Sequence, residues 1–267
     1  MFSAVKKYLA ILAFALSLTT SLFAQSLTGY DIARRADSVE KGKTSSYTAT
    51  MTLTNKKGAK RVREVMMKEK DFGDTTKTVV VFTVPKDVAG VAYLMFEYDE
   101  KADGTKPDSD NWLYMPAMKK VRRISGSTRQ DDFMGTDFTY EDMGERGLSK
   151  DTFTLLGTET VDGTDCYKVE AVAKDKGEKN PRRILWWRTD NYLLQKAEFY
   201  DKQNTLQREL TCSDITQISG IWTTGKMFIK NVQTGHSTLL EMKDVQYNVD
   251  LSDSLFTVTA IERGTVR

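Results

Sequence analysis

The sequence predicts a mainly β protein in which an antiparallel meander curves into a half-open barrel. From residue 45 onwards, apolar and polar side chains alternate in one segment after another, which is typical of strands with one buried face. Short turns such as VDGT, TDN and DKQN separate the segments, so consecutive strands are expected to be antiparallel. The pattern indicates about a dozen strands, near the limit at which an open sheet curls.

Residues 1–24 have the features of a secretory signal peptide: two Lys, then an apolar run, then a small residue, Ala24, before Gln25. The apolar run is shorter than the ~20 residues of a membrane-spanning helix and is interrupted by Ser and Thr. No Cys lies near the cleavage point, so we expect no lipid anchor. The sequence therefore predicts a periplasmic protein whose residues 25–267 form a single domain.

The mature chain is expected to begin with one helix over residues 27–42. Thr28 can cap this helix, and Asp31 is placed to complete a capping box. Ile32 lies on a narrow apolar face, and Gly42 can end the helix. Because the apolar face is narrow, the helix is predicted to lie on the sheet and to cover part of its open side.

The charge of the mature chain is balanced. The full sequence has 39 Lys and Arg and 37 Asp and Glu, and the signal peptide contains two of the Lys and none of the acids. A balanced chain has no overall basic field for nucleic acid, so we expect no nucleic-acid partner.

The sequence contains no recognisable catalytic or metal-binding motif. The GxSxG and GxxxxGK[ST] patterns are absent, and the acidic pairs are adjacent in the chain, which would point them apart in a strand. The single histidine, His236, sits at a turn beside Gly235 and is interpreted as a surface residue without metal-ligating neighbours. We therefore expect neither an enzyme nor a bound metal or cofactor.

Two cysteines, Cys166 and Cys212, are predicted to be free thiols. In a simple meander their strands are three steps apart, which corresponds to ~14 Å between strand axes. A disulfide needs Cα atoms within ~7 Å. The alternation also places the two cysteines on opposite faces of the sheet.

The concave side of such a sheet is predicted to hold an apolar cavity. Only one amphipathic helix and one irregular segment are available to cover it, so the hollow is expected to be underfilled. Several methionines fall on strands, where their unbranched side chains suit a site that accepts different shapes, although they can also fill an ordinary core. In the periplasm the natural guest is an acyl chain. The candidate cavity residues are Tyr47, Met51, Leu53, Met115, Tyr167 and Val169.

Residues 125–150, called the lid below, break the alternating pattern. The segment is too long for a hairpin loop, and long loops are usually functional or partly helical. We expect residues 125–145 to cover the mouth of the cavity. The lid is predicted to contribute three aromatic side chains and a glycine that permits a bend: Phe133, Phe138, Tyr140 and Gly135.

The lid follows directly on a basic run that consists of Lys119, Lys120, Arg122 and Arg123. As a latch, these cations would pair with the carboxylates of the lid. As a cationic mouth, they would meet lipid phosphates or an acidic partner through charge-assisted hydrogen bonds. Both interpretations stay open, because a ligand can compete for the same cations.

The stretch WLYMPAMKKVRRISGSTRQDDFMGTDFTYEDM, residues 112–143, resembles the signature region of the outer-membrane lipoprotein-sorting protein family, the LolA/LolB-like periplasmic carriers. A W-L-Y-x-P strand, a basic run and an F-x-G-[ST]-D-F-[ST]-Y-E-D motif follow one another. The resemblance covers essentially the whole mature chain. It implies a half-open antiparallel barrel with helices as a lid over an apolar cavity.

Two functions are compatible with these features. The first is a carrier that binds lipid or lipoprotein acyl chains in the cavity and moves them toward the outer membrane, with inner- and outer-membrane proteins as docking partners. The second is a non-enzymatic exported sensor or protein-interaction module on the same scaffold, with the cavity filled.

Overall fold

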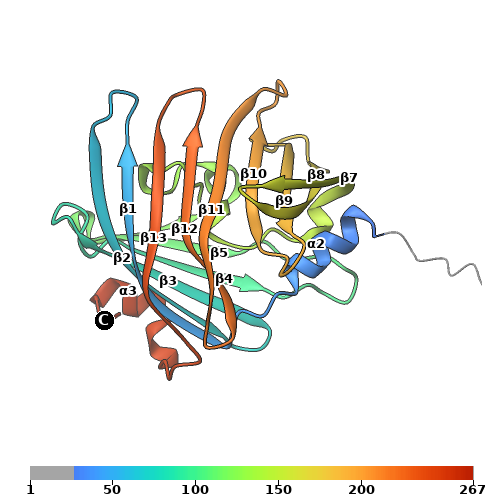
Figure 1. The fold of residues 1–267 in the computed structure, drawn as a ribbon. Coiled ribbons are helices and arrows are strands. Elements are labelled where there is room, and N and C mark those ends of the chain that lie inside the picture. The colour runs from blue at the N-terminus through green and yellow to red at the C-terminus, as the bar shows by residue number, and fades with distance from the viewer. Residues whose placement is uncertain (1–26, 267) are drawn as a thin grey trace, which may run out of the picture.

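The computed structural model describes residues 27–266, so the predicted signal peptide lies outside the described part of the chain. Within that range one antiparallel sheet of thirteen strands dominates the fold (Figure 1). No helix within these residues is both long and apolar enough to cross a membrane. The strands are β1 (Thr44–Thr54), β2 (Lys60–Asp71), β3 (Thr75–Val84), β4 (Ala92–Tyr98), β5 (Asp110–Met115), β6 (Lys120–Ile124), β7 (Asp151–Val161), β8 (Thr164–Ala173), β9 (Arg182–Arg188), β10 (Leu194–Tyr200), β11 (Leu206–Ile218), β12 (Ile221–Asn231) and β13 (Ser237–Tyr247).

The strand order differs from a simple meander at one place. The first and last strands pair with each other, with Met51 of β1 opposite Leu240 of β13. The sheet therefore runs β6-β5-β4-β3-β2-β1-β13-β12-β11-β10-β9-β8-β7, and its two edges are β6 and β7. The mainly β, open architecture that the sequence predicts is confirmed, whereas the pairing of the chain ends was not anticipated.

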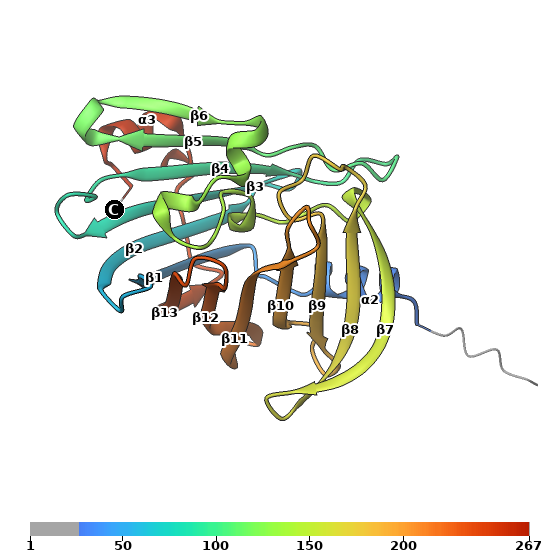
Figure 2. The ribbon, with the colours of Figure 1, turned by 90° about the horizontal axis from the view of Figure 1, so that it is seen from above.

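The alternation predicted for the first strand determines which face of the sheet is buried. Ala49, Met51 and Leu53 are all buried, whereas the threonines between them are exposed or partly exposed. The same face continues across the sheet through Val65 and Phe82 to form the main hydrophobic core. We call this side the concave face. Figure 2 shows the two halves of the sheet running in different directions around it.

The N-terminal helix, α2 (Gly29–Asp37), covers the concave face at the β7 end. Thr28 forms the predicted capping box with Asp31, whose carboxylate accepts from the Thr28 amide at 3.0 Å. The helix ends five residues before the predicted boundary, because Ser38 takes the C-cap position. Gly29 packs directly on β7, since a Cβ there would lie 2.7 Å from the Leu155 nitrogen.

A second hydrophobic cluster covers the opposite, convex face of β3 to β6. The C-terminal helix α3 (Val258–Arg263) contributes Ile261 to it, and the turn η6 (Asp253–Leu255) leads into Phe256. These side chains pack on Val79 and Leu94, which are fully buried. The half of the sheet that carries the lid's aromatic contacts is therefore covered on both faces.

The two cysteines lie on opposite faces, as predicted. Cys166 belongs to a small cluster around Trp186 on the convex face, and Cys212 belongs to the main core. Their strands, β8 and β11, are separated by β9 and β10. Both residues are buried free thiols. Burial raises the pKa of Cys166 to about 11 and that of Cys212 to about 12, so neither is a reactive thiolate at neutral pH.

We predict that an alkylating reagent leaves Cys166 and Cys212 unmodified in the native protein and labels both in denaturant without reductant. Intact mass measured before and after unfolding checks this. A chain that is two hydrogens lighter and resists labelling in denaturant would contradict the strand order.

Candidate functional site

The lid lies across the hollow of the sheet because it joins the two edge strands. Residue 125 follows β6 and residue 150 precedes β7, and these strands are at opposite ends of the strand order. The lid lies between the two halves of the sheet in Figure 2. It consists of short turns of 3-10 helix: η2 (Gly126–Gln130), η3 (Phe133–Gly135), η4 (Glu141–Met143) and η5 (Leu148–Lys150).

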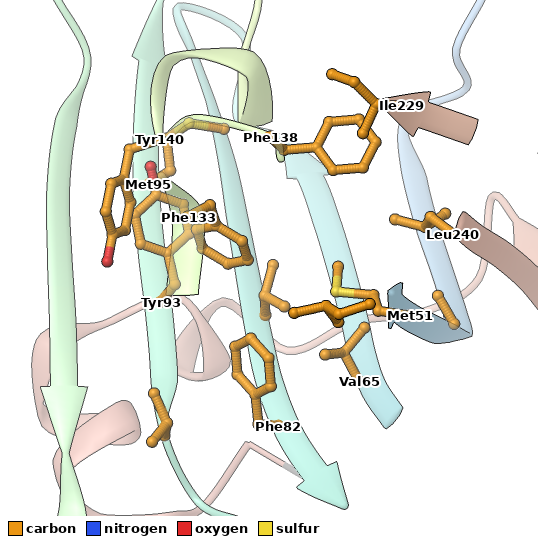
Figure 3. Close-up of a cluster of buried hydrophobic side chains, with 14 of the residues drawn as sticks. Met51, Val65, Phe82, Tyr93, Met95, Phe133, Phe138, Tyr140, Ile229 and Leu240 are labelled. Atoms are coloured by element: carbon orange, nitrogen blue, oxygen red, sulfur yellow. The ribbon is translucent and has the colours of Figure 1, made fainter. Parts of the chain in front are cut away.

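An aromatic cluster holds the middle of the lid against β3 and β4. Phe133 is fully buried, with its ring centroid 5.9 Å from that of Phe82, 5.4 Å from Tyr93 and 5.3 Å from Tyr140 (Figure 3). Phe138 points the other way, toward Ile229. All three aromatic side chains predicted for the lid thus belong to the main core. Such a wedge is worth several kcal/mol, since truncating a buried Phe to Ala typically costs about 3–5 kcal/mol.

A tight turn lets the lid insert this wedge. Gly135 has φ 74°, in the left-handed region that glycine tolerates best. The Phe133 amide donates to the Phe138 carbonyl at 2.7 Å, and an isolated bridge joins Asp132 to Thr139. The turn therefore satisfies much of its own backbone before it meets the sheet, as a buried loop must.

Arg208 of β11 is the main polar anchor of the lid. Its Nη1 donates to the Asp137 carbonyl at 2.9 Å and to the Asp142 carboxylate at 2.5 Å, and its Nη2 donates to Asn180 at 3.0 Å. Only 4% of Arg208 is exposed, so its charge depends on Asp142. Burial would raise the pKa of Asp142, but the charge and hydrogen bonds of Arg208 outweigh it and the pKa is lowered.

Asp137 is tied to the start of β13 by a second set of bonds. Its amide donates to the Thr238 hydroxyl at 3.1 Å, and that hydroxyl donates to its carboxylate at 2.7 Å. The His236 Nδ1 lies 2.7 Å from the same carboxylate oxygen. The interpretation of His236 as a plain surface residue was therefore wrong. The side chain is partly exposed but contacts the lid, and the sequence does not show this contact because Asp137 and His236 are 99 residues apart.

Arg146 and Arg63 hold the two flanks of the lid. Arg146 donates to Asp151 at 2.9 and 3.0 Å, and further to Glu141 and Glu178. Burial lowers the pKa of Arg146, but its bonds to Asp151 and the neighbouring carboxylates more than offset this and the pKa is raised. Arg63 of β2 donates to the Met134 carbonyl. The tethers thus come from several strands on both halves of the sheet.

The basic run that precedes the lid does not form the expected latch. Arg123 pairs with Asp110 of the neighbouring strand instead. Within residues 27–266, Lys119, Lys120 and Arg122 form no salt bridge. The physical reason is the path of the chain: after Ser125 it turns inward, which carries the lid's acids away from their sequence neighbours and toward cations of the other half. The cationic-mouth interpretation of the run is left as a proposal.

A cavity of about 360 Å³ lies between the lid and strands β9 to β12. Its polar rim includes Arg146 and Arg208, and Phe138 of the lid reaches into its lining. The rest of the lining on the sheet is largely apolar. These apolar residues are Leu185, Leu194, Phe199, Leu210, Met227 and Ile229.

The cavity residues expected from the sequence lie on the concave face but do not line this cavity. Met51, Leu53 and Val169 are almost fully buried, and Tyr47 and Met115 pack against the main core. Tyr167 stacks on Tyr192 with ring centroids 6.0 Å apart, close to the helix residue Arg35. The lid and α2 fill the hollow at these positions. The lining residues of β9 to β12 also alternate in the sequence, but only the strand order shows that they share the uncovered part of the face.

The end of the lid near β7 contacts a partly buried carboxyl of the sheet. The Glu97 carboxylate of β4 accepts from the Glu145 amide at 2.6 Å, and Glu145 pairs with Lys41 and Lys106. Burial raises the pKa of Glu97 to about 7. Glu69 of β2 shares this trend, since burial raises its pKa as well.

The described residues contain no group of three or more His, Cys, Asp or Glu placed to hold a metal ion. What the site offers is a concave apolar floor, a wedge of aromatic side chains and a set of buried ion pairs. Such an arrangement can enclose an apolar guest and exclude water from it.

Comparison with known proteins identifies the family. A family model with the description "-like: Uncharacterized protein" matches residues 74–263. A crystal structure of a DUF1329 family protein from Desulfovibrio piger is 35% identical, covers 87% of this chain and 97% of its own, and superposes with a TM-score of 0.81. An outer membrane lipoprotein-sorting protein domain from Vibrio parahaemolyticus is 30% identical, covers 88% and 98%, and has a TM-score of 0.80.

The chain belongs to this family of DUF1329 and outer-membrane lipoprotein-sorting domains. A LolA superfamily protein from Nitrosomonas europaea shares the fold at 21% identity, with coverage of 88% and 99% and a TM-score of 0.66. No curated protein sequence matches the chain. The resemblance inferred from residues 112–143 is confirmed, and the LolA superfamily protein shares the open sheet.

We predict that the lid of this protein loosens when its main anchor is removed. Arg208→Met removes the buried partner of Asp142, whose side chain is 21% exposed, and leaves that carboxylate without its counter-charge, so it should lower the free energy of unfolding by about 2 kcal/mol. Hydrogen exchange in residues 131–143 should rise while β1 to β3 keep their protection. The matched control is Arg123→Met, which removes a largely exposed pair and should cost less than about 1 kcal/mol. Equal effects of the two variants would contradict the anchor.

We predict that stability falls between about pH 5 and pH 8 because of Glu97. Its folded pKa of about 7 exceeds the unfolded value of about 4.3, so the folded state binds the proton more tightly. The resulting stabilisation is present below the unfolded pKa and is lost as pH rises through the folded pKa.

Glu97→Gln keeps an acceptor for the Glu145 amide and removes the charge. It should raise the unfolding free energy at pH 8 by about 1–2 kcal/mol and flatten its pH dependence. Denaturant titrations at several pH values measure both effects, and an unchanged slope between pH 5 and 8 would refute the assignment.

Proposed function

We propose that this protein is a periplasmic carrier that binds lipid or lipoprotein acyl chains under its lid and moves them toward the outer membrane. The observation that carries the proposal is the cavity of about 360 Å³ between a tethered lid and the apolar floor of β9 to β12. Its volume is at the lower end of the range for ligand sites, which is 300–1,000 Å³ in general. One relative with the same fold, the protein from Vibrio parahaemolyticus, is described as a lipoprotein-sorting domain, which supports the same role.

An acyl chain gains enough from burial in such a site to be carried through water. Each buried CH₂ contributes ~0.8 kcal/mol, so a chain of about fourteen carbons contributes on the order of 10 kcal/mol. A whole chain needs more room than the closed cavity offers. Movement of the lid residue Phe138 away from Ile229 would extend the apolar floor toward β13.

The tethers of the lid suit a reversible movement. They are hydrogen bonds and ion pairs that join one continuous segment to Arg208, His236 and, through Arg146 of the lid, Asp151, so they can break together without disturbing the sheet. Release of the cargo then requires an acceptor that offers comparable burial, such as a membrane or a membrane-bound partner. Nothing in this cycle requires a cofactor or a chemical step by the protein.

The direct test is mass spectrometry of an organic extract from protein purified from the periplasm without detergent. We expect co-purified phospholipid, fatty acid or acylated peptide at a substantial fraction of the protein concentration. Clean protein that also fails to take up added lipid would favour the sensor or protein-interaction function over the carrier.

A pair of neighbouring substitutions tests the site itself. Met227 lines the cavity, whereas Phe228 is on the other face of β12 and is 40% exposed. Met227→Trp fills part of the cavity and should weaken binding of a fluorescent fatty acid about ten-fold or more. Phe228→Trp adds the same side chain outside and should leave the affinity within about two-fold, as measured by fluorescence titration. Similar affinities for both variants would place the ligand elsewhere.

A further inference from the structure

Three hairpin turns lie next to one another at one end of the strands β1 to β6. Antiparallel pairing brings residues 55–59, 85–91 and 116–119 to the same end, and Figure 2 shows the turns along one side of the molecule. Two of them are in close contact, since a Cβ on Gly90 would lie 3.2 Å from the ring of Pro116. We define the basic rim as these turns with their flanking residues: 55–64, 84–91 and 116–122.

The basic rim concentrates positive charge on a nearly neutral protein. It holds nine Lys and Arg against two acids, Glu64 and Asp87, whereas the whole chain has 39 against 37. Arg63 donates to the Met134 carbonyl. Within residues 27–266 the other eight cations form no salt bridge, and all of them are exposed. They are Lys56, Lys57, Lys60, Arg61, Lys86, Lys119, Lys120 and Arg122.

Apolar side chains protrude among these cations. Seven large hydrophobic side chains are exposed in the described part of the chain, and three of them lie on the basic rim. Met118, at the tip of the β5–β6 turn, is 53% exposed, Val62 is 46% exposed and Val84 is 40% exposed. Exposed cations alone are enough to keep a protein soluble and to prevent its association with other copies. Exposed apolar side chains do not serve that purpose, so the combination indicates a partner that is both anionic and apolar.

We propose that the basic rim is the surface with which this protein docks onto an anionic lipid bilayer. The eight free cations lie against phosphate headgroups, and Met118 and the two valines enter the boundary between headgroups and acyl chains. Nucleic acid fits less well, because the rim contains no aromatic side chain on which a base can stack. The docking surface is separate from the cavity and does not depend on which cargo, if any, the cavity carries.

The basic rim also borders two tethers of the lid. Arg63 of the rim holds the Met134 carbonyl. Gly235 packs against Lys56, since a Cβ there would lie 3.3 Å from its side chain, and the next residue, His236, contacts the carboxylate of Asp137. A docked bilayer therefore lies beside the bonds that close the lid, which suits transfer of a chain between the membrane and the protein.

Vesicle co-sedimentation of the full mature protein tests the docking surface. The vesicles are phosphatidylcholine alone, or phosphatidylcholine with about 30% phosphatidylglycerol, at about 50 and 300 mM NaCl, which bracket physiological screening. We expect binding only to the anionic vesicles, and weaker binding at high salt. The triple variant Lys119→Gln, Lys120→Gln, Arg122→Gln should lose at least about ten-fold in partition coefficient. Met118→Ser should lose about three-fold at both salt concentrations.

The matched control removes three exposed cations elsewhere, with Lys43→Gln, Lys101→Gln and Lys176→Gln. It should bind as the wild type does. Wild-type binding that is absent, or equal on both kinds of vesicle, overturns the proposal, and so does a control that loses as much as the rim variant. If the protein binds soluble polyglutamate or DNA as tightly as it binds the anionic vesicles, and Met118→Ser has no effect, a soluble polyanion is the partner instead. Uptake of fluorescent fatty acid by the rim variant, measured without vesicles, should be unchanged, which separates this test from that of the carrier function.

Discussion

The pairing of β1 with β13 is the constraint on which the rest of the structure depends. Because the two ends of the chain share one ladder, the strands before and after residues 125–150 become the two edges of the sheet. The connection between them has no short route along the surface, so it must cross the hollow. The position of the lid thus follows from hydrogen bonds made far from it, and the curvature of a thirteen-strand sheet supplies the hollow that it crosses.

A segment placed in this way has to satisfy two opposite requirements. It must bury enough apolar surface to stay in place, which Phe133 does among Phe82, Tyr93 and Tyr140. It must also find partners for its backbone and its charges, because an unpaired polar group inside the hollow is costly. Arg208 is such a partner, because it donates hydrogen bonds to a carbonyl and to a carboxylate of the lid at the same time. Buried ion pairs contribute little net stability but select one geometry, so they hold the lid in a defined place and leave it separable from the sheet.

The two proposed functions fall on different halves of the sheet. On β9 to β12 the lid leaves a cavity with an apolar floor, whereas on β2 to β5 the aromatic wedge packs into the hollow. The helix α3 closes the convex face of that filled half, and the turns at its end carry the free cations. A half that presents a charged edge and a half with a cavity suited to an apolar guest are compatible with one another in a single sheet. The physical separation lets contact with a membrane and enclosure of a ligand be altered independently.

The sequence by itself determined the strand faces, the capped helix, the separation of the two cysteines and the family, because each of these depends on local spacing or on a contiguous motif. Ala49, Met51 and Leu53 are buried as their alternation requires, and Thr28 caps its helix with Asp31. The identity of the lid was also readable, since residues 125–150 lack a strand period and carry aromatic side chains. Only the tertiary structure decided which partners these residues meet. The lid carboxylates bind Arg208, Arg146 and His236 rather than the adjacent basic run, and the cavity opens on β9 to β12 rather than at Met51 or Val169. Both outcomes depend on which strands become neighbours, and that choice is made by the pairing of segments almost two hundred residues apart, where local spacing carries no information.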